Sequence, residues 1–195
     1  LGGAETPYAS DADVLFVHEA RPGADRHEAA DEAEAVARWV VRLLSQAQPH
    51  PFEVDADLRP EGRQGPMSRS LGSYADYYER WSAVWERQAL LRARACAGDA
   101  ELGRAFEELV EPLRWSPDGL DDDGLRQIRR LKARMEAERL PRGTNPARHI
   151  KLGPGGLSDV EWAVQVLQLQ HAARVSELRT TSTLEALDAA RSAGE

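Results

Sequence analysis

The sequence is poor in cysteine and in long apolar runs, and each shortage excludes a class of protein. Cys96 is the only cysteine among 195 residues, so the chain has no internal disulfide and no cysteine-based zinc site. A lone thiol is typical of a reduced compartment, and we expect a cytoplasmic location. No apolar stretch approaches the roughly 20 residues that a membrane-spanning helix needs, so we predict no membrane partner.

Basic residues are also scarce relative to acidic ones. The chain has 25 Lys and Arg against 33 Asp and Glu, which gives a net charge of −8. A phosphate backbone attracts basic surfaces, so this balance predicts no nucleic-acid partner. The hydrophobic fraction of 42% is sufficient for a buried core in one large or two small domains.

The hydrophobic pattern predicts two different halves. Residues 13–18 and 52–58 are expected to be strands, and residues 26–47 between them a helix. The apolar face of that helix is expected to consist of Ala29, Ala33, Val36, Val40 and Leu43. From about residue 71 the pattern is nearly all helical. We therefore predict an α+β class, mostly α overall, with a small α+β domain at 1–66 and a helical bundle at 70–195.

Spacing and capping signals add detail to the helical half. One stripe at three- and four-residue steps is expected to form the core side of a single helix that ends at Gly98; it comprises Leu71, Tyr74, Tyr78, Trp81 and Trp85. Residues 141–146 are expected to be a loop. Two later helices each begin with Ser-x-x-Glu, at Ser158 and at Ser182, which is the pattern of a capping box.

Two carboxylates near the N-terminus are the first candidate for chemistry. Asp11 and Asp13 stand two apart at the start of an apolar run, after the glycine turn Gly2-Gly3. On a strand both would point from one face, where their repulsion is relieved by a divalent cation such as Mg²⁺. Small residues upstream allow a backbone to approach phosphates closely. The alternative is a strand that simply starts in a solvated turn, where Asp is common.

A second acidic segment follows in the other predicted strand. Asp55, Asp57 and Arg59 alternate, so they would share one strand face. An acid from this strand beside Asp11 and Asp13 would complete a three-carboxylate, two-metal site, and Arg59 would offer its fork to a phosphate. The alternative is an exposed edge strand with a local salt bridge.

A third candidate precedes the helix expected from residue 158. Lys151 and three glycines within residues 153–156 stand just before this helix N-terminus, an arrangement that suits an anion. Asp159 and Glu161 have a simpler explanation, because acidic residues in a first turn favour the helix dipole.

Taken together, these segments resemble the glutamine synthetase adenylyltransferase family, whose members adenylylate and deadenylylate glutamine synthetase. The resemblance is carried by residues 2–13, 55–65, 77–94 and 151–165. It implies a polymerase-β-type nucleotidyltransferase palm, N-terminally incomplete, followed by a helical bundle. Residues 140–143 and 178–184 make the chain similar to the C-terminal, adenylylating domain of an actinobacterial member. We accordingly expect the chain to begin inside a domain.

The resemblance also implies roles for individual residues. Asp11 and Asp13 match the metal-binding pair, and Asp55 matches the third acid, although Asp57 competes for that position. Gly2, Gly3 and Ser10 match the nucleotide-contacting turn, and Arg59 matches the arginine of the family's Leu-Arg-Pro motif. Lys151 is expected to hold charge on the phosphates.

The implied activity is the transfer of AMP from ATP to a tyrosine of glutamine synthetase, with two Mg²⁺ ions. Two alternatives remain open at this point. One is the sister activity, in which phosphate removes the AMP. The other is a catalytically silent domain that binds glutamine synthetase or a nitrogen-regulatory PII protein.

Overall fold

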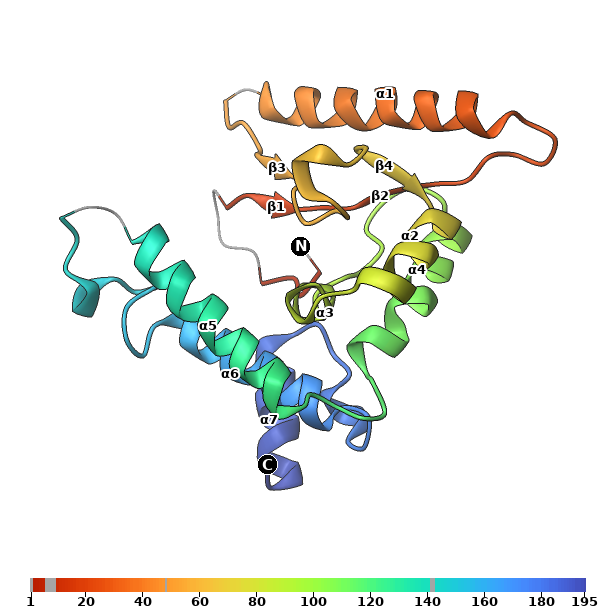
Figure 1. Ribbon diagram of the computed structural model, residues 1–195. Coiled ribbons are helices and arrows are strands. Elements are labelled where there is room, and N and C mark those ends of the chain that lie inside the picture. The colour runs from red at the N-terminus through yellow and green to blue at the C-terminus, as the bar shows by residue number, and fades with distance from the viewer. Residues whose placement is uncertain (1, 6–9, 48, 141–142) are drawn as a thin grey trace. The chain divides into compact units, whose positions relative to one another are not determined.

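The computed structural model describes residues 2–5, 10–47, 49–140 and 143–195. The first elements are β1 (Ala12–Asp13), β2 (Phe16–His18), α1 (Arg26–Ser45), β3 (Val54–Asp55) and β4 (Ser68–Ser70). Six further helices follow within the described ranges: α2 (Leu71–Trp81), α3 (Val84–Leu90), α4 (Ala100–Arg114), α5 (Asp122–Arg139), α6 (Leu157–His171) and α7 (Thr183–Ala193) (Figure 1). The mostly helical class is therefore confirmed.

The chain packs as two compact units. Unit 1 comprises Leu1–Ser82 and Ala93–Leu109, and unit 2 comprises Ala83–Arg92 and Val110–Glu195. Compact packing alone does not test independent folding, so the domains 1–66 and 70–195 stay a prediction. Among the described residues, no helix has the length and apolar character needed to cross a bilayer.

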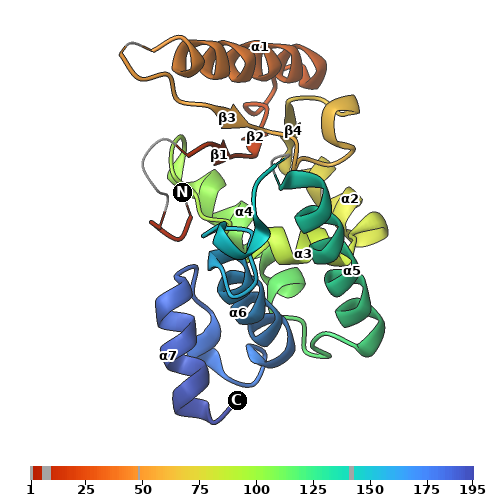
Figure 2. The ribbon, with the colours of Figure 1, turned by 90° about the vertical axis from the view of Figure 1, so that its left-hand side faces the viewer.

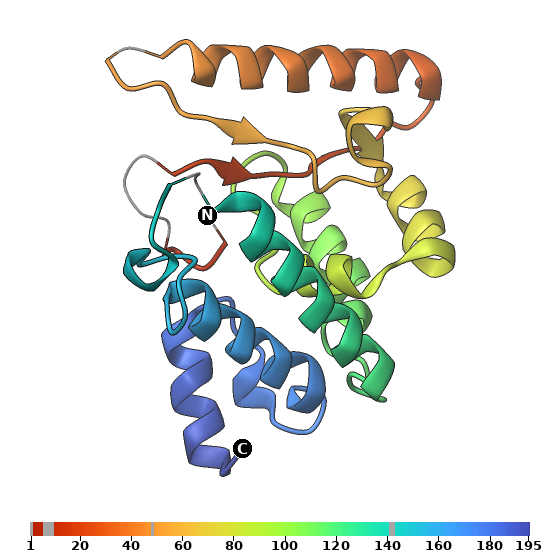
Figure 3. The ribbon, with the colours of Figure 1, turned by 60° about the vertical axis from the view of Figure 1, so that its left-hand side comes forward.

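Unit 1 is built around two pairs of short parallel strands. The predicted strand 13–18 is found as β1 and β2, which pair with β3 and β4 respectively. Figures 1 and 3 show α1 along one side of these strands and α2 on the other. Because α1 connects the first two strands to the last two, it acts as the crossover that parallel pairing requires.

The buried side of α1 agrees with the predicted one only in part: Ala29, Ala33 and Val40 are half-buried, as predicted. Asp25 caps the helix by accepting from His27 N and Glu28 N, and Ala37 is buried. Val36 and Leu43, predicted to face the core, are 59% and 52% exposed. The reason is Glu34, whose Oε2 accepts from Met67 N at 2.6 Å, so the helix presents the Glu34 side to β4.

The aromatic stripe is only partly a core face. Tyr74 and Tyr78 are buried, and the Tyr74 ring packs edge-on against Phe106 of α4, with ring centroids 5.2 Å apart. Trp81 and Trp85 are 70% and 40% exposed, so their predicted burial is wrong.

A helix break explains the exposure of Trp85, whereas Trp81 is the last residue of α2 and lies before the break. The predicted single helix ends at Trp81, and α3 starts afresh after Ala83, whose N–H donates to Glu86 Oε2 at 2.8 Å. This new start interrupts the 3.6-residue period, so the residues after it do not continue the buried side of α2.

Unit 2 has its own hydrophobic core, supplied by α3, α5, α6, α7 and the segments between them. Its buried members are Leu91, Trp115, Leu120, Ile128, Val164, Leu169, Ala172, Leu178, Ala186 and Ala190. Figure 2 shows α6 beside α7. Buried Gln168 of α6 binds the segment that leads into α7, because its amide donates to the carbonyls of Leu178 and Thr180 at 2.8 and 2.7 Å.

The two predicted capping boxes have different outcomes. Ser182 caps α7 by accepting from Glu185 N, as predicted. Ser158 does not cap α6: the cap is Gly156, and Ser158 is buried inside the first turn. Of the predicted loop 141–146, Pro141 and Arg142 lie outside the described residues.

Candidate active site

The register of β1 against β3 places Asp13 opposite Asp55. Backbone bonds fix this alignment, with Ala12 N donating to Glu53 O at 2.9 Å and Val14 N to Asp55 O at 2.7 Å. Residues paired across neighbouring strands project from the same face of a sheet. The two carboxylates, 42 positions apart in the chain, are thus brought to one face by two residues of pairing.

The remaining N-terminal candidates belong to the same unit. Asp11 is exposed, and Ser10 Oγ donates to its Oδ1 at 3.2 Å. Gly2 and Gly3 form a turn, and the Gly2 carbonyl accepts from Arg94 Nε at 3.1 Å. The contact with Arg94 fixes the turn to the chain segment that follows α3, a contact that the sequence pattern did not indicate.

Asp57 contacts two arginines, whereas no arginine within the described ranges is hydrogen-bonded to Asp55. Asp57 Oδ2 accepts from Arg63 Nε at 2.7 Å, and its Oδ1 lies 3.5 Å from Arg59 Nη1. Asp55 Oδ1 instead accepts from the Asp57 N–H at 2.7 Å, a local turn that orients its carboxylate. The two acids that competed for one role in the sequence therefore differ in their surroundings, and these favour Asp55 as the group that faces a ligand.

Arg59 lies inside the loop that follows β3. Its residue exposure is 8%, and its guanidinium donates to Ala56 O at 2.7 Å and to Gly65 O at 3.2 Å. These bonds close residues 56–65 into a compact loop. The contact with a phosphate that the sequence predicts for Arg59 stays a prediction.

Arg63 is a cation near the candidate acids that the sequence reasoning missed. Its side chain is 82% exposed, and the hydrogen bond to Asp57 raises its pKa, with a smaller contribution from the charge of Asp55. Its position in a glycine-flanked turn, with Gly62 before it and Gly65 after it, is the signal that could have indicated it.

Lys151 lies in unit 2, exposed, in the turn that precedes α6. The amides at this helix start already have acceptors: Leu157 N donates to Ile150 O at 2.9 Å, and Ser158 N to Lys151 O at 3.0 Å. Gly155 N donates to Asp159 Oδ2 at 2.6 Å. An anion at a helix N-terminus needs unbonded amides, and these three amides donate to acceptors within the turn or in the first turn of α6. The role of Lys151 stays a prediction.

The carboxylates of β1 and β3 fit the usual binding mode of Mg²⁺. Within the described ranges, no group of three or more His, Cys, Asp or Glu side chains is close enough to hold a metal ion. Mg²⁺, however, is usually held by one or two carboxylates together with water and substrate phosphates. Asp13 and Asp55, aligned on one face of the strand pair, fit that mode, and Asp11 stands two residues before Asp13.

Two family profiles match parts of the chain. The family profile described as glutamate-ammonia ligase adenylyltransferase matches residues 1–109. That described as GlnD PII-uridylyltransferase matches residues 126–194.

Curated relatives match over nearly the whole chain. One from Streptomyces coelicolor is 60% identical and one from Streptomyces avermitilis 62%, each over 100% of this chain and 20% of the relative. One from Mycobacterium tuberculosis is 57% identical over 96% of this chain and 19% of the relative. All three are named bifunctional glutamine synthetase adenylyltransferase/adenylyl-removing enzyme.

The class defined by the fold and the site is a mostly helical protein in which short parallel strands pair two carboxylates on one face. Within that class, the chain belongs to the glutamate-ammonia ligase adenylyltransferase family. The family resemblance stated from the sequence is confirmed. The chain spans about a fifth of the length of the curated relatives it matches.

Proposed function

We propose that this chain transfers AMP from ATP to a tyrosine hydroxyl of glutamine synthetase. The observation that carries the proposal is the register of Asp13 against Asp55, which aligns two carboxylates in the compact unit that also contains Gly2 and Gly3. The names of the relatives supply the reaction class and the target protein. The proposal includes a polymerase-β-type palm in unit 1 and a cytoplasmic location.

In the proposed reaction the tyrosine oxygen attacks the α-phosphorus of ATP. The new bond joins that oxygen to phosphorus, and the bond to the bridging oxygen breaks, so that pyrophosphate leaves. Asp55, oriented by the Asp57 N–H, accepts the phenolic proton. Asp11, Asp13 and Asp55 would hold two Mg²⁺ ions, which when bound lower the pKa of the attacking hydroxyl and stabilise the leaving group.

The other predicted residues would bind the nucleotide. Gly2, Gly3 and Ser10 would approach its phosphates, and Lys151 and Arg59 would balance their charge. For Arg59 this requires the guanidinium to reach a phosphate while it holds Ala56 O and Gly65 O. Arg63 is on the same loop and largely exposed, so it is better placed than Arg59 to contact a phosphate that enters from solvent.

The name of the relatives covers two opposite reactions, so the direction must be measured. The 195-residue chain is incubated with Mg²⁺, α-labelled ATP and purified glutamine synthetase. Asp13→Asn and Asp55→Asn test the site, and Asp31→Asn, an exposed change on α1, is the matched control. Circular dichroism verifies that each variant is folded.

We expect label on glutamine synthetase with the wild type and Asp31→Asn but not with the two site variants. If the wild type transfers no label and instead releases ADP from adenylylated glutamine synthetase on addition of phosphate, the adenylyl-removing activity is the correct one. If neither reaction occurs while glutamine synthetase or a PII protein binds, the chain acts as a scaffold and the proposal is wrong.

A further inference from the structure

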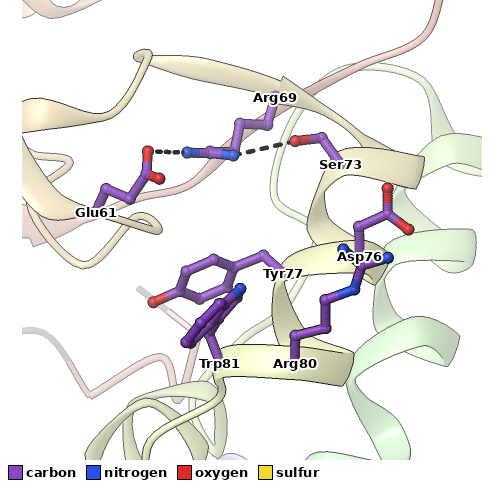
Figure 4. A pocket seen from close by; sticks show the side chains of 7 residues that line it. All are labelled: Glu61, Arg69, Ser73, Asp76, Tyr77, Arg80 and Trp81. Carbon is purple, nitrogen blue, oxygen red and sulfur yellow. Dashed lines mark hydrogen bonds and ion pairs between the residues drawn. The ribbon is translucent and has the colours of Figure 1, made fainter.

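Unit 1 has an open pocket of about 510 Å³ on the side of α2. Its lining comes from the loop after β3, from β4 and from α2: Glu61, Arg69, Ser73, Asp76, Tyr77, Arg80 and Trp81 (Figure 4). This volume is in the range of small-molecule sites. None of these residues belongs to the carboxylate site described above.

One wall of the pocket is rigidly built. The Arg69 side chain is 12% exposed, and its Nη2 donates to Glu61 Oε2 at 2.6 Å while its Nη1 donates to Ser73 Oγ at 3.1 Å. Among the described residues, no acceptor reaches its buried Nε. A largely buried guanidinium that is bonded at both ends forms a fixed polar wall rather than a loose surface pair.

Glu61 is held in this position at a conformational cost. Its φ of 63° is in the left-handed region, which side-chain-bearing residues rarely adopt, and Gly62 follows at 55°. Such strain persists where the surroundings fix it, and it is concentrated at ligand sites. Here the strain directs the Glu61 carboxylate to Arg69 at the rim of the pocket (Figure 4).

The opposite wall is aromatic. Tyr77 and Trp81 are four residues apart on α2, and Figure 4 shows their rings next to each other, facing the Glu61–Arg69 pair. Trp81 is 70% exposed, an unusual state for the largest apolar side chain. Exposed flat rings in a concave site are platforms on which heteroaromatic rings stack.

The charges in the lining select among ligands. Arg69 and Arg80 are cations and Glu61 and Asp76 are anions, so the formal charges cancel. A neutral lining does not concentrate a polyphosphate. It suits a neutral flat ring that carries both hydrogen-bond donors and acceptors along its edge, with carboxylates that accept from an exocyclic amine.

The pocket is also connected to the carboxylate site by one loop. Asp55 ends β3, and Glu61 follows six residues later in the loop that Arg59 closes. Six residues span at most about 20 Å even when fully extended. The pocket wall and Asp55 are therefore parts of one continuous, internally bonded segment.

We propose that this pocket binds the adenine base of the nucleotide, with the ring stacked on Trp81 and Tyr77. The inference rests on the proposed function, since it assumes that ATP is the substrate. Arg69 and Glu61 would contact the edge of the base, and the phosphates would extend toward the paired carboxylates.

The test compares two probes on the 195-residue chain by calorimetry: Mg-ATP, which has a base, and Mg-tripolyphosphate, which has none. Trp81→Ala removes the stacking platform, and Trp81→Phe retains a ring. Trp39→Ala is the matched control, because Trp39 is 60% exposed on α1 and lies outside the pocket.

We expect Trp81→Ala to raise the dissociation constant of Mg-ATP by about tenfold or more, as measured for lost base stacking elsewhere. Trp81→Phe and Trp39→Ala should stay within about threefold of the wild type, and binding of tripolyphosphate should not change.

The inference is overturned if Trp81→Ala binds Mg-ATP as the wild type does, or if it loses ATP and tripolyphosphate equally. Because the transfer of label to glutamine synthetase is measured separately, the first result would leave the proposed function intact. A wild-type chain that binds neither probe would overturn both proposals.

Discussion

At the scale of single residues, Arg59 is the side chain that fixes the loop next to the candidate site. Its buried guanidinium donates to Ala56 O and Gly65 O and lies beside the Asp57 carboxylate. Gly65 makes this closure possible, because a Cβ at that position would lie 2.3 Å from Pro60 O. The conformation of the loop that carries Asp55 and Glu61 thus depends on the Arg59 guanidinium and on the absence of a side chain at Gly65.

Arg59→Ala should therefore destabilise unit 1. Removal of the guanidinium leaves two buried carbonyls without their donor and the Asp57 carboxylate with one arginine instead of two, which we expect to cost about 2 kcal/mol or more. Chemical denaturation followed by circular dichroism measures the loss. Arg63→Ala is the matched control, because this arginine shares Asp57 but is 82% exposed, and its midpoint should stay near that of the wild type. Equal midpoints for the two variants would contradict the structural role of Arg59.

Tyr74 gives a prediction on pH. Burial raises the pKa of Tyr74 to about 12, and its hydroxyl donates to Phe16 O at 3.3 Å. The folded protein then holds this proton more tightly than the unfolded chain, whose tyrosines ionise near pH 10. The resulting stabilisation is complete below pH 10 and is lost as the pH rises from about 10 to 12.

We expect Tyr74→Phe to flatten this part of the alkaline stability profile. The variant loses one hydrogen bond, at about 1 kcal/mol near neutral pH, but has no phenol to ionise. Thermal unfolding of both proteins between pH 8 and 11 is the measurement. Parallel profiles would show that Tyr74 ionises as freely in the folded state as in the unfolded one.

At the scale of elements, the turn before α6 shows why glycines occur where an anion site was predicted. A Cβ on Gly153 would lie 2.2 Å from Pro146 O and 2.5 Å from His149 O. The Asp159 side chain folds back to Gly155 N and pairs with Lys132 of α5, and this lysine lowers the pKa of Asp159. The glycines here allow close approach of backbone to backbone.

Gly153→Ala should consequently destabilise unit 2 by about 2 kcal/mol or more, since backbone atoms cannot move aside as a flexible side chain can. Gly72→Ala is the matched control: it is in α2, nothing lies within 4 Å of its Cβ position, and alanine favours helix by up to about 1 kcal/mol. Thermal melting distinguishes the two. A Gly153→Ala protein as stable as the wild type would mean that the turn can open.

The same elements show what local sequence can predict. Hydrophobic period located α1 and α4 to α7 because each buries one side against a neighbour. It failed at Ser82–Ala83, where Glu86 starts a new helix by capping Ala83 N. It also failed for Val36 and Leu43 of α1, where the bond from Met67 N to Glu34 sets which side of the helix is buried. Both outcomes depend on contacts with backbone groups, which a pattern of side chains does not record.

For the candidate site, too, the sequence indicated the residues but not their contacts. The alternation of Asp55 with Asp57 and the spacing of Asp11 and Asp13 selected the candidate acids, whose roles stay predictions. The partner of each acid comes only from the fold: Asp13 lies opposite Asp55, and Asp57 is bound by Arg59 and Arg63. The pocket at Trp81 was not predictable, because the periodicity assigned that tryptophan to the core.

At the scale of the whole molecule, the single cysteine gives a direct test of the described surface. Cys96 is exposed. We expect a thiol reagent to label one thiol per chain without denaturant, and none in Cys96→Ser. A wild-type chain that reacts only after denaturation would show that this segment is covered, for example by a second copy of the chain.

The β1–β3 pairing restricts where insertions and deletions can occur in related sequences. Each carboxylate is presented by a strand of only two residues, and a one-residue slip turns a strand's side chains to the opposite face. One added or deleted residue within 12–13 or 54–55 would therefore separate Asp13 from Asp55 while leaving the composition almost unchanged. Insertions in the loop between β2 and α1 leave the register intact, so we expect gaps in an alignment of the family to accumulate there and to be absent from the two strands.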